Sequence, residues 1–221
     1  LTFKADPRSE HGPHILIGNH ASRADYVFYG FTLLPNKYNF VIGHNEFYRS
    51  HLAFIVRALQ AIPKKNFVLD YYPVKNMKRI LEAGGNICIM PEGMSSITGM
   101  AQPVMPGIGK LLKSLKVNVY YTKISGGYLT YTKHCLDARK GRCEVVVDKM
   151  FSPEDLAAMS EADIERAVKD ADEVESMIAA QRIAEKALED VLNIIRPGLT
   201  EKEIAAELTY RMLKYGGEEN S

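Results

Sequence analysis

The sequence has few cysteines, no long hydrophobic run and almost no net charge. Its three cysteines, Cys88, Cys135 and Cys143, are scattered and odd in number, which argues against a disulfide framework and fits a reducing compartment. The longest nearly continuous apolar stretch runs from Tyr26 to Leu34 and is too short to cross a bilayer. The start does not resemble a signal peptide, and because the first residue is leucine we expect truncation at the N-terminus.

The composition of the 221 residues is typical of a globular protein, with 46% hydrophobic and 25% charged residues, which excludes global disorder. The net charge of +1 conceals two regions of opposite charge. Lys and Arg outnumber Asp and Glu by 20 to 10 over residues 1–150, whereas the acids outnumber the bases by 17 to 8 from residue 151 onward. A basic first region fits phosphate ligands, anionic lipid or nucleic acid, although solvation explains any single cation. No nucleic-acid-binding motif accompanies it, so we expect no nucleic-acid partner.

Apolar runs and helical periodicities alternate over the first 150 residues. Short apolar runs predict strands, and apolar residues at helical spacing predict helices. The predicted strands are 14–18, 40–42, 86–90, 117–124 and 143–147, and the predicted helices are 26–34, 52–62, 75–82 and 108–115. This alternation favours a layered α/β domain. The 52–62 segment offers an apolar surface for a membrane, but we expect it to be a core helix.

The last third of the chain has a helical pattern. Ser152-Pro153-Glu154-Asp155 is a helix start, and 173–195 carries apolar or small residues at helical spacing, namely Met177, Ala184, Leu188, Val191 and Ile195. Thr200 and Glu203 form a capping box for a second helix, which ends before Gly216-Gly217. We therefore expect an α-helical hairpin with apolar stripes.

A histidine and an aspartate five residues apart carry the first chemical signal. His20 follows the predicted 14–18 strand and Asp25 begins the next helix, so the carboxylate can fold back onto the imidazole. Such a contact fixes the tautomer of the ring and leaves its other nitrogen free to take a proton from a substrate hydroxyl. The alternative is structural, because Ser22-Arg23-Ala24-Asp25 also matches a capping box.

A glutamate-glycine turn carries the second signal. Pro91-Glu92-Gly93 follows the predicted 86–90 strand, at the strand end where α/β sheets bind ligands. Gly93 permits close approach of a ligand, and Glu92 and Ser96 supply polar groups. The alternative is an ordinary turn with an exposed acid.

Taken together, Asn19-His20-x-Ser22-x-x-Asp25 and Pro91-Glu92-Gly93-x-x-Ser96 resemble the glycerolipid acyltransferase family, which includes lysophosphatidic acid acyltransferases. The resemblance covers roughly residues 10–168. It implies a layered mixed sheet flanked by helices, and transfer of a fatty acyl group from acyl-CoA or acyl carrier protein to a lysophospholipid hydroxyl. The acceptor that it favours is 1-acyl-sn-glycerol-3-phosphate.

The same resemblance assigns roles to residues. His20 would be the general base and Asp25 its orienting partner, with Asn19, Ser22, Lys64, Lys65, Glu92, Gly93 and Ser96 in the substrate site. Lys64 or Lys65 would be the basic residue that the family carries in a block ahead of its Glu-Gly block. The family's phosphate-pairing arginine is replaced by Ser95, which puts the identity of the acceptor in doubt because serine cannot replace a bidentate arginine. The later Val-Pro-Val block is Val117-Asn118-Val119 here.

The C-terminal hairpin has a resemblance of its own. Residues 173–217, with Arg196-Pro197-Gly198 between the helices, resemble the first helices of the catalytic domain of Xaa-Pro aminopeptidases and creatinase. The metal ligands of that family are absent, so no peptidase activity is expected. We expect an acyltransferase domain at 1–168 and a helical hairpin appendage at 169–221, which is either native or a fusion.

The sequence thus predicts an O-acyltransferase of phospholipid biosynthesis that meets membrane lipids as a peripheral protein on the cytoplasmic membrane face. The alternatives are a catalytically inactive lipid-binding module and a hydrolase of acyl thioesters that uses the same His20 and Asp25 pair. We expect no bound cofactor, and the spacing of histidines and cysteines predicts no metal site.

Overall fold

A computed structural model of the chain describes residues 2–10, 12–20, 22, 25–48, 53–65, 70–96, 102–126, 143–196 and 198–215, without the side chains of residues 32, 55 and 172–182. Cys135, Leu52, Pro197, the side chain of Met177 and Gly216-Gly217, which the sequence analysis singled out, lie outside this description.

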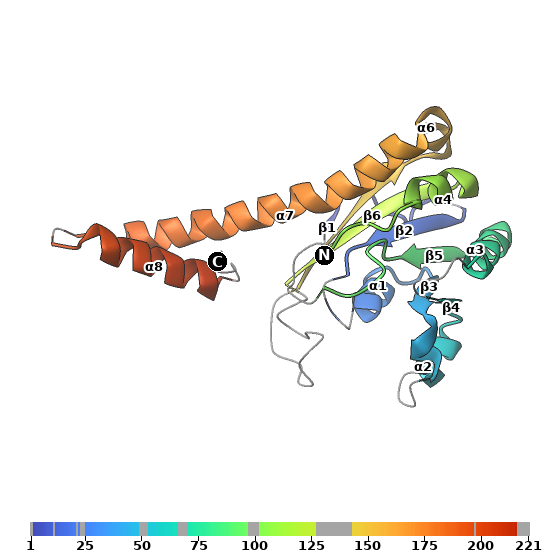
Figure 1. Cartoon of the computed structure of the whole chain (residues 1–221), viewed down its shortest axis with the longest axis horizontal. Coiled ribbons are helices and arrows are strands. Elements are labelled where there is room, and N and C mark those ends of the chain that lie inside the picture. Colours follow the sequence, from blue (N-terminus) through green and yellow to red (C-terminus); the bar gives the residue numbers. More distant parts are fainter. Residues whose placement is uncertain are drawn as a thin grey trace. The chain divides into compact units, whose positions relative to one another are not determined.

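Seven strands form one mixed sheet in the order β1-β7-β6-β2-β5-β3-β4 (Figure 1). Neighbouring strands are parallel except β6 and β7, which pair antiparallel. The strands are β1 (Thr2–Phe3), β2 (His14–Gly18), β3 (Tyr38–Gly43), β4 (Ile62–Lys64), β5 (Asn86–Ile89), β6 (Asn118–Ser125) and β7 (Glu144–Phe151). The predicted layered mixed α/β sheet is therefore confirmed.

Helices of the first unit pack on both faces of this sheet. The helices in the described ranges of the chain are α1 (Asp25–Thr32), the 3-10 helix η1 (His44–Tyr48), α2 (Ala53–Ala58), α3 (Tyr72–Glu82), α4 (Ile108–Leu115), α6 (Pro153–Ala158), α7 (Glu161–Leu192) and α8 (Glu201–Lys214). Ile15 and Ile17 of β2 pack in one buried cluster with residues of α3, α4, α6 and the start of α7, whereas Leu16 packs in a second cluster with α1. Ile15, Leu16 and Ile17 of β2 and Ile87 to Ile89 of β5 are uninterrupted apolar runs because both faces of these strands are covered.

The parallel strands bring distant segments of the chain to one edge of the sheet. Ile17 of β2 pairs with Ile89 of β5, and Gly43 of β3 pairs with Lys64 of β4. The segments that follow these strands, at His20, Glu92, η1 and Lys65, therefore begin at the same carboxyl edge. In sheets of this kind ligands bind at that edge.

The segment predicted as a core helix at 52–62 is different in the structure, and that prediction is wrong. Helix α2 ends at Ala58, Gln60 has a positive φ of 50°, and the chain then enters β4. Only Val56 of the described α2 side chains is buried, and Phe54 is 80% exposed. Pro63 concealed the strand in the sequence, but β4 lies at the edge of the sheet, where proline is tolerated.

Helix α7 begins twelve residues before the predicted start at 173. Ser160 supplies the missed signal, since its Oγ accepts from the backbone N–H of Asp163 at 3.2 Å and satisfies an N–H of the first turn. The chain divides into two compact units, 1–171 and 172–221, so the division falls inside this helix.

The second unit is a helical hairpin formed by the rest of α7 and by α8. The predicted capping box at Thr200 and Glu203 is present. Arg211 pairs with Asp190 at 2.9 Å, and the Lys186 ammonium lies 4.4 Å from the centre of the Tyr215 ring.

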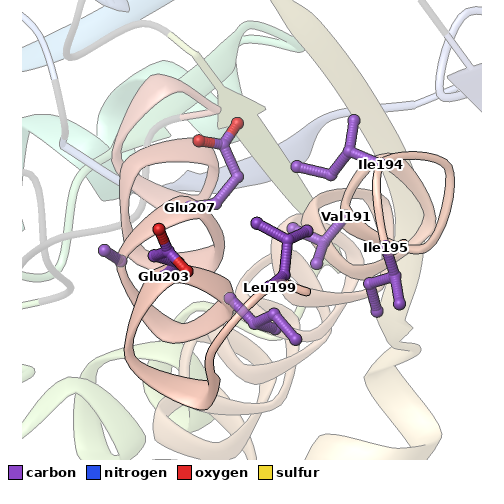
Figure 2. A pocket seen from close by; sticks show the side chains of 8 residues that line it. Val191, Ile194, Ile195, Leu199, Glu203 and Glu207 are labelled. Carbon is purple, nitrogen blue, oxygen red and sulfur yellow. The ribbon is translucent and has the colours of Figure 1, made fainter. Parts of the chain in front are cut away.

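The packing face of this hairpin differs in part from the predicted stripe. Val191 is buried as expected, but Leu188 is 48% exposed and Ala187 is buried in its place. Figure 2 shows an apolar hollow of about 370 Å³ between the end of α7 and the start of α8, lined by Val191, Ile194, Ile195, Leu199, Glu203, Ile204, Ala206 and Glu207.

None of the helices in the described ranges combines the length and hydrophobicity that a membrane span requires.

Candidate active site

The side chains of His20 and Asp25 are in contact at the carboxyl edge of the sheet. His20 follows β2, Asp25 is the first residue of α1, and His20 Nδ1 lies 2.9 Å from Asp25 Oδ2. The Asp25 side chain is fully buried, whereas 22% of the His20 side chain is exposed. A buried carboxylate therefore holds a ring that reaches the surface.

Asp25 uses one oxygen atom both to cap the turn into α1 and to hold the His20 ring, the two roles that the sequence suggested for it. Asp25 Oδ2 accepts from the backbone N–H of Ser22 at 2.8 Å as well as contacting the imidazole. The Ser22 contact is half of a capping box, so Asp25 both closes the turn into α1 and orients the ring. The buried charge is stabilised by these donors.

The geometry of the ring determines which nitrogen can accept a proton. A carboxylate oxygen 2.9 Å from Nδ1 stabilises the tautomer that carries its proton on Nδ1. No described residue hydrogen-bonds to Nε2, so this nitrogen keeps its lone pair for a substrate proton.

The glutamate-glycine turn holds the backbone of His20. Glu92, which is 7% exposed, accepts from the His20 backbone N–H through Oε1 at 2.6 Å and from the Gln102 backbone N–H through Oε2 at 3.0 Å. The Ser96 backbone N–H in turn donates to the His20 carbonyl at 2.7 Å. The two motifs therefore form one site, and the Glu92 carboxylate binds protein backbone rather than pointing into solvent.

Asn19 ties the same loop to β6. Its side-chain amide accepts from the Ile124 backbone N–H at 2.8 Å and donates to the Ile124 carbonyl at 3.0 Å. The buried hydroxyl of Tyr29 donates to the Asn19 carbonyl at 2.7 Å. Asn19 thus positions the backbone that precedes His20.

Lys64 lies beside Gly93, at the mouth of the turn. Its Nζ is 2.7 Å from Met105 Sδ and 3.6 Å from the point that a Cβ on Gly93 would occupy. Gly93 has a φ of 73°, which favours glycine, and a side chain there would collide with Met105. Burial lowers the pKa of Lys64, and within the described part of the chain no carboxylate pairs with its ammonium.

The structure separates the two candidate lysines. Lys64 faces the turn, whereas Lys65 has an exposed side chain and only its backbone N–H contacts Asp70, at 3.4 Å. No motif marks Gln102, Met105 or Tyr29 as part of the site. Gln102 and Met105 lie beyond the second motif, and Tyr29 lies in α1, directly after the first motif. Over the described residues, no cluster of three or more His, Cys, Asp or Glu side chains could hold a metal ion.

Comparison with known proteins agrees with this architecture. The family model described as Acyltransferase matches residues 2–124, and the model of metallopeptidase family M24 matches residues 175–221. The crystal structure of the 1-acyl-sn-glycerophosphate (LPA) acyltransferase PlsC from Thermotoga maritima is similar, with a TM-score of 0.66, 16% sequence identity, and coverage of 80% of this chain and 72% of that chain. No curated protein matches the chain. Because the first family model spans more than half of the sequence, the chain belongs to the acyltransferase family.

Proposed function

We propose that this acyltransferase transfers a fatty acyl group from acyl-CoA or acyl carrier protein to the free hydroxyl of a lysophospholipid, with 1-acyl-sn-glycerol-3-phosphate as acceptor. The observation that carries the proposal is the contact between the buried Asp25 carboxylate and Nδ1 of His20, whose side chain is partly exposed at the strand edge where ligands bind. The fold of the PlsC enzyme, which acts on a lysophosphatidic acid, supports the choice of acceptor.

In the proposed reaction His20 Nε2 takes the proton of the acceptor hydroxyl while the oxygen attacks the thioester carbonyl. The new carbon–oxygen bond forms as the carbonyl π electrons move onto oxygen, and the tetrahedral intermediate then expels the thiolate. The imidazolium returns its proton to the leaving sulfur, so the thiol and the ester are the products. Asp25 stabilises the imidazolium between these two steps.

Glu92 acts in this scheme as a positioning residue. Its two oxygens accept backbone N–H groups from the loops on either side of the site, which fixes where Nε2 points. Small displacements of a catalytic group reduce rates strongly, because the reacting atoms must lie about 3–3.5 Å apart.

Lys64 supplies the cation that the sequence lacks at Ser95. Its ammonium is partly desolvated and has no carboxylate partner among the described residues, so it gains by meeting the phosphate of an acceptor. The absence of a side chain on Gly93 lets Met105 and the Lys64 ammonium pack close to the backbone of the turn.

Replacing the base should abolish transfer without unfolding the protein. We expect His20→Ala to lower kcat by about 10²–10⁴-fold, the usual contribution of a positioned general base. The assay offers labelled acyl-CoA with several lysolipids and identifies products by mass. The control is His44→Ala, since His44 contacts Tyr48 on η1 instead. Wild-type rates in folded His20→Ala would refute the assignment, and equal thioester loss with and without acceptor would show hydrolysis in place of transfer.

Glu92→Gln should separate positioning from substrate binding. The amide can accept only one of the two N–H groups, so we expect a lower kcat, an unchanged KM for the acceptor, and a loss of about 1–3 kcal/mol in the free energy of unfolding. Steady-state kinetics and chemical denaturation measure these quantities. Glu82→Gln, on the exposed end of α3, serves as the matched control. A raised KM at unchanged kcat would instead make Glu92 a substrate ligand.

Lys64 and Lys65 form a matched pair for the phosphate contact. We expect Lys64→Met to raise the KM for the phosphate-bearing acceptor roughly ten- to hundredfold, the equivalent of one charged hydrogen bond. Both acceptors are water-soluble short-chain forms, so that membrane binding does not enter the measurement. Lys64→Met should leave the KM for the uncharged monoacylglycerol unchanged, and Lys65→Met should change neither KM. A phosphate contact at Lys64 would be contradicted if both variants raised the KM equally, or if Lys64→Met raised the KM for the uncharged acceptor as much as that for the phosphate-bearing one.

A further inference from the structure

Four aromatic side chains are exposed where the chain follows β3 and β4. Tyr48 ends η1, Phe54 lies on α2, and Tyr71 and Tyr72 lie at the start of α3, each with more than half of its surface in solvent. We call these four residues the aromatic rim. Phe31 at the end of α1 is exposed to a similar extent, so exposure alone does not distinguish the rim. What distinguishes it is that four exposed rings follow two neighbouring strands, β3 and β4.

The elements that carry the rim are continuous with the edge that holds the site. Helix η1 starts directly after β3 ends at Gly43, and Arg57 of α2 donates to the Phe47 carbonyl of η1 at 3.4 Å. Helix η1 also packs against β4, whose last residue is Lys64. The rim therefore borders the carboxyl edge where His20 and Lys64 lie.

Basic residues are frequent in the segment that carries these aromatics. Residues 44–82 contain seven Lys or Arg against three Asp or Glu, and the side chains of Arg57, Lys65, Lys75, Lys78 and Arg79 are exposed. Amphipathic aromatic rings settle at the headgroup level of a bilayer, and each nearby cation adds attraction to anionic lipid. The same combination is poorly suited to an ordinary protein interface, whose core is depleted of charge and especially of lysine.

We propose that the aromatic rim and its cations dock the enzyme on an anionic membrane, with the short helix α2 inserting Phe54 at the interface. This inference rests on the proposed function, since a lysophospholipid acceptor reaches His20 and Lys64 from the lipid side. Docking through this edge brings the acceptor to the site without removing it fully from the bilayer.

The test compares binding to phosphatidylcholine vesicles with and without phosphatidylglycerol, by sedimentation. The full chain should bind the anionic vesicles and be released by salt, because exposed charges are screened. We expect Phe54→Ser, combined with Tyr48→Ser, to weaken binding about tenfold or more, given the apolar surface that each ring buries. The matched control is Phe31→Ser, which removes an equally exposed ring from the last turn of α1, outside the rim.

Activity on a water-soluble short-chain acceptor and donor separates this inference from the proposed function. The rim variant should keep wild-type turnover of these substrates and lose turnover on vesicles. Three results would overturn the proposed docking surface. The wild-type protein does not bind anionic vesicles, the rim variant binds them as tightly as the wild type does, or Phe31→Ser weakens vesicle binding as much as the rim variant does. Vesicle binding that depends on the rim, in a chain that turns over no soluble substrate, would support docking and overturn the proposed function instead. The docking proposal would also be overturned if the wild-type protein bound a soluble protein partner and did not bind vesicles.

Discussion

One buried carboxylate organises the site. Asp25 has no exposed surface, and an ionised group in that position is stable only when donors surround it. Two of its donors are the Ser22 backbone N–H and the His20 imidazole, both at Oδ2. The need to satisfy this charge therefore folds the loop after β2 and sets the orientation of the ring. Structure and proposed chemistry depend on the same two hydrogen bonds.

A second carboxylate extends this constraint across the sheet. Glu92 joins the backbone of His20 to that of Gln102, so the loop after β2 and the loop after β5 hold one another. The arrangement explains why the two motifs occur together although they are far apart in the chain. Lys64 lies beside Gly93 at this turn, where the proposed acceptor phosphate would lie.

Local patterns predicted the elements that depend on local chemistry. The apolar run of β2 and the periodicity of α4 were sufficient to give their observed bounds, and the spacing of His20 and Asp25 predicted their contact. The strand β4 was not predictable in the same way. Pro63 and the helical spacing of the preceding residues both argue against a strand there, and only the pairing with β3 makes it one. Similarly, no local signal shows that Glu92 turns inward to two backbone groups, or that Lys64 rather than Lys65 meets the turn. These contacts are set by the register of parallel strands, which one segment alone does not specify.

The orientation of the His20 ring is the claim on which the account depends most. Nitrogen-15 NMR of histidine-labelled protein, with His20 assigned by comparison to His20→Gln, reports directly which ring nitrogen carries the proton. We expect the tautomer that carries its proton on Nδ1 and leaves Nε2 bare, and loss of this preference in Asp25→Asn. A His20 ring protonated at Nε2, with Nδ1 bare in the folded protein, would contradict it.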